Sequence, residues 1–101
     1  MFIVTSDPIN TKWNDPSIKG RVYGGEYHGG KQRIRLLDDD GIVYFYLQSD
    51  INYVTDTFDA GPNAGKEATD EQEFYPLDTL GASYGCTHLQ YKDLEGNYKT
   101  L

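Results

Sequence analysis

The sequence is poor in the residues that carry redox and metal chemistry, with one cysteine, two histidines and one methionine in 101 positions. A lone Cys86 cannot close an internal disulfide, so we expect a fold that does not depend on oxidation. A structural zinc site needs four cysteine or histidine ligands at short spacings, which this composition cannot supply. A disulfide scaffold and a zinc module are therefore excluded.

Long apolar runs are also missing. No stretch approaches the roughly 20 apolar residues that a helix needs to cross a bilayer. The first residues, MFIVTSDP, form a short apolar run without a basic leader, which is not the pattern of a signal peptide. We therefore expect a soluble cytoplasmic protein without membrane contacts, located in the host cytoplasm if a phage encodes it.

Tyrosine and glycine are abundant instead, with nine and eleven residues. Aromatic residues favour strands, and glycine- and proline-marked turns separate the short strands of small β domains. We predict a single mostly β domain over residues 1–101, folded as a small antiparallel barrel or sandwich of five to seven strands with one short helix. An SH3-like barrel is one such architecture, and this analogy of shape implies no function.

The clearest element is a β-hairpin within residues 31–50. Residues 33–36 alternate polar and apolar side chains, and residues 42–47 are rich in aromatic and β-branched ones. Three aspartates and Gly41 between them have the chemistry of a tight turn. A four-residue loop pairs Leu36 with Val43 and Ile34 with Phe45. The core face then holds Ile34, Leu36, Val43, Phe45 and Leu47. A bulged three-residue loop would change this pairing.

Shorter patterns predict the remaining elements. Thr69 and Gln72 have the spacing of a capping box, which predicts a helix over residues 70–74 that ends before Pro76. β-prone stretches predict strands over residues 2–4, 18–23, 51–58, 86–91 and 98–101. Loops are predicted over residues 9–17, with Trp13 either packed on the core or exposed, and over residues 59–66 and 79–85.

Three motifs resemble functional sites but lack required residues. An EF-hand numbered with Gly41 at its sixth position has Leu36 at its first, and leucine cannot bind calcium. Residues 61–66 resemble a phosphate-binding loop, but Ala60 stands where its first glycine belongs and Glu67 stands where Ser or Thr must follow the lysine. Cys86 and His88 are too few for a metal site, and a buried cysteine packing as a small hydrophobe is the simpler interpretation. We predict no catalytic residue, no metal and no cofactor.

The charge of the chain is its most unusual feature. The formal net charge is −7, and residues 50–80 hold eight acidic residues against one basic residue, Lys66. Charge asymmetry concerns partners and solubility more than fold. Our leading hypothesis is a non-enzymatic binding protein, an inhibitor that mimics nucleic-acid charge and docks a basic, nucleic-acid-binding protein surface. The candidate contacts are Asp50, Asp56, Asp59, Asp70, Glu71 and Glu73.

In style, the chain resembles the small acidic accessory proteins that phages and mobile elements encode. This resemblance implies a counter-defence role and carries over no site residues. The plainer interpretation of the acidic segment is a solubilising surface with its aromatic residues turned inward.

The alternative hypothesis is a small-ligand binder. A basic and aromatic sheet face can hold a nucleotide-like anion, because arginine grips phosphates and stacks on rings. The net charge of −7 argues against long nucleic acids, whose binding depends on phosphate neutralisation. The same residues can simply stabilise the sheet through cross-strand pairs. The candidate residues are Arg21, Lys31, Arg33, Arg35, Tyr44 and Tyr46. Exposed edge strands leave both a monomer and a homodimer open.

Overall fold

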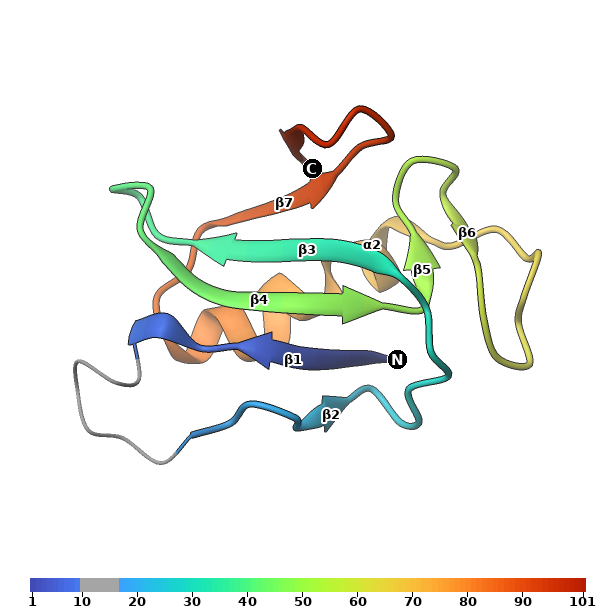
Figure 1. The fold of residues 1–101 in the computed structure, drawn as a ribbon, viewed down its shortest axis with the longest axis horizontal. Helices are drawn as coiled ribbons and strands as arrows, with labels where there is room; N and C mark the ends of the chain where they lie inside the picture. The colour runs from blue at the N-terminus through green and yellow to red at the C-terminus, as the bar shows by residue number, and fades with distance from the viewer. Residues whose placement is uncertain (10–16) are drawn as a thin grey trace.

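The computed structural model describes residues 1–9 and 17–101. Their large sheet is antiparallel, with the strand order β2-β1-β4-β3-β7-β8 (Figure 1). Its strands are β1 (Phe2–Ser6), β2 (Val22–Tyr23), β3 (Gln32–Leu37), β4 (Val43–Ser49), β7 (His88–Lys92) and β8 (Tyr98–Thr100). A small second sheet pairs β5 (Ile51–Asn52) with β6 (Thr57–Phe58).

The predicted fold class is confirmed in its open, sandwich-like form. The sheet does not close into a barrel, because the edge strands β2 and β8 each pair with one neighbour and not with each other. The predicted position of Trp13 lies outside the described residues.

One face of the sheet is covered and the other is open. The helix α2 (Asp70–Pro76) and the helical turn η1 (Leu77–Gly81) pass behind the sheet in Figure 1, and Leu80 belongs to the buried core. The buried side chains that the sheet contributes to this core are those of Phe2, Val4, Ile34, Leu36, Phe45, Leu47 and Leu89. Because successive strand residues point to opposite faces, the residues between them point to the open side.

The central hairpin has its predicted faces but not its predicted pairing. Leu36 lies opposite Phe45 and Ile34 opposite Leu47, two residues away from the predicted register. A three-residue turn accounts for one residue of this difference, and a bulge between Leu36 and Leu37 accounts for the other. A shift of two residues keeps a side chain on its original face, so the predicted core positions of Ile34, Leu36, Phe45 and Leu47 are confirmed. Beyond the bulge the prediction was wrong, because Tyr44 packs against the core and Val43 does not belong to it.

The turn of this hairpin is the bulged form. The Asp38 carboxylate accepts hydrogen bonds from the backbone N–H groups of Asp40 and Ile42, at 3.0 and 2.9 Å. Gly41 has a φ of +79°, a value that favours glycine. The backbone N–H of Asp38 also donates to the Ile42 carbonyl oxygen, so the loop holds three residues, 39–41, one fewer than in the predicted four-residue loop.

The helix extends further than predicted. The capping box is confirmed, because the backbone N–H of Gln72 donates to Thr69 Oγ1 and the N–H of Thr69 donates to Gln72 Oε1. The chain then stays helical through Pro76 and continues as the wider π-type turn η1. Pro76 is fully buried, and Leu80 packs in the core. Tertiary burial therefore overrides the local effect of proline.

Two predicted strands are shorter than expected. Residues 51–58 form the β5–β6 hairpin, because the Asn52 side chain accepts hydrogen bonds from the N–H groups of Val54 and Thr55 and starts a turn. Asp56 completes the turn with a φ of +58°. In residues 18–23 only Val22 and Tyr23 form a strand.

A buried carboxylate joins the start of β3 to the end of β4. Asp50 is 2% exposed and accepts hydrogen bonds from the backbone N–H groups of His28 and Gly30. Gly30 lies so close to this junction that a Cβ atom would come within 2.3 Å of the Ser49 carbonyl oxygen. The contact sets Gln32 opposite Ser49, and with it the alignment of the central strands.

We predict that Gly30→Ala lowers the free energy of unfolding by roughly 2–4 kcal/mol, since the added methyl group meets rigid backbone. The matched control is Gly29→Ala, whose Cβ meets no atom within 4 Å but whose φ is +89°. The backbone strain alone should cost this variant about 1 kcal/mol. Chemical denaturation measures both values, and equal losses would contradict the close approach at Gly30.

Candidate functional site

The acidic residues proposed as partner contacts are divided between the interior and the surface. Asp50 and Glu73 are only 2% and 4% exposed, so their inclusion in a docking surface was wrong. The backbone turn at residues 28–30 and the packing of α2 bury them. The other four are exposed: Asp56, Asp59, Asp70 and Glu71.

Two of the four exposed acids line different grooves in the described part of the chain. Asp59 lines a groove with Lys31 and Arg33, whereas Glu71 lines another with Gly24 and Tyr75. The acidic residues concentrated in positions 50–80 thus border at least two separate grooves. Docking through the four exposed acids stays a prediction.

Glu73 is buried beside a second carboxylate. Its Oε2 atom has no hydrogen-bond partner among the described residues. Burial, followed by the hydrogen bond and charge of Asp56 and the charge of Asp70, raises the pKa of Glu73 to about 7. The buried Tyr53 hydroxyl donates to the Glu73 carbonyl oxygen at 2.7 Å, which joins the turn after β5 to α2.

The open face of the sheet brings together half of the proposed basic and aromatic residues. Arg33 and Arg35 alternate with the buried Ile34 and Leu36 on β3, so both point to the open side. Tyr46 on β4 lies directly opposite Arg35. The prediction that both arginines share a face with Tyr46 is thus confirmed by the strand register.

Arg35 is held in place by residues of the last two strands. Its guanidinium carbon lies 3.9 Å from the centre of the Tyr98 ring, a cation–π contact. Its Nε–H donates to Gln90 Oε1 at 2.8 Å. Among the described residues, the terminal N–H groups of this guanidinium make no hydrogen bond, so they can donate to a ligand.

A groove of about 370 Å³ crosses this open face. Polar and aromatic side chains line it, and none of the lining residues is acidic; they include Thr5, Arg33, Tyr46, Gln48 and Tyr98. Arg33 is exposed at its edge. The groove therefore combines a cation, two aromatic rings and neutral hydrogen-bonding groups.

The other proposed basic and aromatic residues lie elsewhere. Arg21 is beside β2, where its carbonyl oxygen accepts the Val4 N–H. Tyr44 packs partly on the core near Asp38, and burial, followed by the charge of that carboxylate, raises its pKa. Lys31 lines a second groove next to the open face. Including Arg21 and Tyr44 in one patch was wrong, because Arg21 lies beside β2 and the Tyr44 side chain packs partly against the core.

Sequence reasoning missed three residues of the open face: Gln90, Lys92 and Tyr98. The signal was present in the alternation of β7, where Leu89 is buried and its neighbour Gln90 points outward. What could not be read from the sequence is that β7 pairs with β3. Because β7 pairs with both β3 and β8, Tyr98 lies over Arg35, although about sixty residues separate the two in the sequence.

Within residues 1–9 and 17–101, no group of three or more His, Cys, Asp or Glu side chains is arranged to hold a metal ion. The free Cys86 is buried, and this burial, followed by the charge of Asp38, raises the pKa of its thiol to about 11. A thiol with that pKa is a poor nucleophile at neutral pH. No helix in the described part of the chain is long and apolar enough to cross a membrane.

Comparisons of the chain with protein-family models, with curated proteins and with solved structures returned no significant match. The geometry of the open face is therefore the basis for any functional inference.

The raised pKa of Glu73 predicts a pH-dependent stability. Its carboxyl ionises near pH 4.5 in the unfolded chain and near pH 7 in the folded one, so its favourable contribution is lost as pH rises between these values. Glu73→Gln keeps the neutral form. We expect this variant to match the wild type near pH 4.5 and to exceed it by on the order of 3 kcal/mol at pH 8.

Denaturant titrations at several pH values measure this difference. Glu71→Gln, an exposed change on the same helix, is the matched control and should show no such trend. A constant gap between Glu73→Gln and wild type across the pH range would contradict the buried-carboxyl interpretation.

Proposed function

We propose that the chain is a non-enzymatic binding module that holds a nucleotide-like anion on the open face of its large sheet. The observation that carries this proposal is the distribution of charge over the strands. None of the eight described strands contains an acidic residue, although the protein has sixteen. Outward positions of the sheet instead carry Arg33, Arg35 and Lys92, beside the rings of Tyr46 and Tyr98.

The chemistry of this face matches the two parts of a nucleotide. Planar bases stack on exposed aromatic rings whatever their identity, and arginine grips phosphate oxygens with parallel N–H donors. The volume of the groove, about 370 Å³, lies within the roughly 300–1,000 Å³ range typical of small-ligand sites. Tyr46 and Tyr98 would contact the base and Arg33 the phosphate, while Arg35, which lies over the Tyr98 ring, adds positive charge beside the groove.

The overall charge limits the size of the ligand. With a net charge of −7, the molecule repels a long polyanion, whereas a small one meets mainly the local field of the face. The expected lack of catalysis, the cytoplasmic location and the phage or mobile-element origin stay predictions.

The first test uses adenosine monophosphate and isothermal titration calorimetry. We expect Arg33→Gln to weaken binding by about tenfold, because it removes a charged phosphate contact from an exposed side chain. Lys19→Gln removes a cation from an exposed site beside β2 and should leave binding unchanged. Equal effects of the two substitutions would show that only the net charge matters.

The second test separates stacking from charge. Tyr98→Leu removes the ring and should weaken binding by roughly tenfold, whereas Tyr98→Phe keeps the ring and should bind like the wild type. Melting temperatures of both variants check that the fold is intact. A wild type that adenosine monophosphate neither binds nor stabilises would end the proposal.

A further inference from the structure

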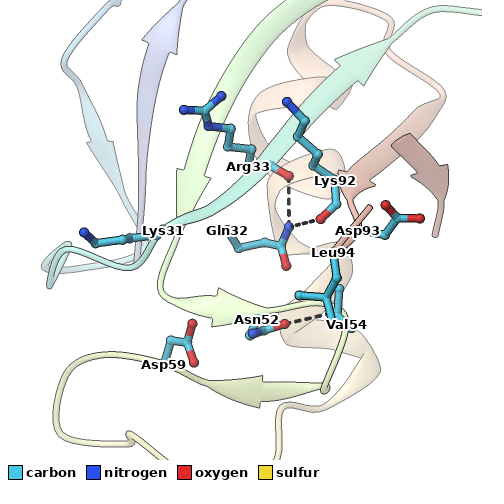
Figure 2. A pocket seen from close by; sticks show the side chains of 9 residues that line it. All are labelled: Lys31, Gln32, Arg33, Asn52, Val54, Asp59, Lys92, Asp93 and Leu94. Atoms are coloured by element: carbon cyan, nitrogen blue, oxygen red, sulfur yellow. Dashed lines mark hydrogen bonds between the residues drawn. The ribbon is translucent and has the colours of Figure 1, made fainter. Parts of the chain in front are cut away.

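A second groove lies against the one described above, at the point where β3 begins. Its volume is about 260 Å³, and it is bordered by the sheet, the β5–β6 hairpin and the turn after β7. Figure 2 shows Arg33 and Lys92 pointing the same way from neighbouring strands, with Asn52 and Asp59 across from them. Arg33 lines both grooves, so the two hollows meet at its side chain.

The floor of the second groove is rigid. The Gln32 side chain donates from Nε2 to the carbonyl oxygens of Arg33 and Lys92, at 3.2 and 2.8 Å (Figure 2). Its Oε1 accepts the N–H of Tyr53 at 2.9 Å. One carboxamide therefore joins β3, β7 and the start of the β5–β6 turn, so the walls of the groove keep their spacing.

The balance of charge in this groove is positive. Lys31, Arg33 and Lys92 face two carboxylates, those of Asp59 and Asp93. Asp93 is already engaged, because it accepts two backbone hydrogen bonds in its own turn and lies 3.7 Å from Lys99 Nζ. An anionic group at the junction of the two grooves would thus meet Arg33 and Lys92 first.

The far wall is apolar and unusually exposed. Leu94 is 89% exposed and Val54 is 38% exposed, and both line the groove. Beside them, Asn52 uses its oxygen to accept the Val54 N–H, which leaves its NH₂ donors for a ligand. An apolar ledge next to an amide donor fits a planar heterocycle, which stacks on one side and accepts hydrogen bonds at its edge.

We propose that the ligand of this protein is a dinucleotide or a short single strand and not a mononucleotide. The first base lies in the Tyr46–Tyr98 groove, the connecting phosphate lies at Arg33 and Lys92, and the second base lies against Val54 and Leu94. This inference rests on the proposed function, since it extends the same site. The first groove, of about 370 Å³, is already within the usual size range of a ligand site, whereas the second, of about 260 Å³, is below it and would act only as an extension of the first at Arg33.

The test compares 5′-phosphorylated diadenylate, pApA, with adenosine monophosphate by calorimetry. We expect pApA to bind about tenfold tighter, because the second base gains its own contacts. The double variant Lys31→Gln with Leu94→Ser should reduce pApA binding to the level of the mononucleotide and leave the mononucleotide unaffected. Both positions are exposed, so the fold should not change.

The matched control is Lys19→Gln with Ile42→Ser, which removes the same kinds of group from exposed sites away from the groove. It should bind both ligands like the wild type. If the mononucleotide binds but pApA binds no tighter, the inference is wrong and the proposed function stands. If pApA binds tighter in wild type and in the Lys31/Leu94 variant alike, the second base lies elsewhere and the inference is again wrong. If neither ligand binds, both fail.

Discussion

The large sheet depends on the contact between the Asp50 carboxylate and the backbone at Gly30. A carboxylate that is nearly removed from water must be satisfied by hydrogen bonds, and the N–H groups of His28 and Gly30 supply them. The close approach allows no side chain at residue 30. Because β3 starts at this contact and β4 ends there, it sets which residues of the two central strands face each other. An acidic residue that looked like part of a surface is thus a structural anchor.

This alignment separates the charges of the molecule. The described strands contain four of the nine basic residues and five of the nine tyrosines, and none of these strands contains a carboxylate. A protein with a net charge of −7 can therefore present a groove without any acidic lining residue. The local field at that groove, and not the net charge, governs a small ligand within a Debye length of about 8 Å. Glu73 shows the opposite situation, since packing of α2 forces a carboxyl group next to Asp56 and out of water.

Local patterns predicted the elements whose determinants lie within a few residues. The Thr69–Gln72 capping box and the alternation around Ile34 both gave correct results, because hydrogen bonds and periodicity of this kind act over short distances. The continuation of the helix through Pro76 was missed, since its cause is burial against the sheet. The candidate site was half predicted: Arg33, Arg35 and Tyr46 were named, while Tyr98, Gln90 and Lys92 were not.

The sequence by itself determined that the chain is β-rich, that β3 and β4 form a hairpin, and which of their faces is apolar. These properties follow from side-chain periodicity, which a shift of register by two residues leaves intact. Only the tertiary structure decided that β7 lies beside β3, that Arg35 meets Tyr98, and that Asp50 and Glu73 are buried. Pairing between distant strands depends on how the whole chain buries its apolar surface, and no short stretch of sequence contains that information.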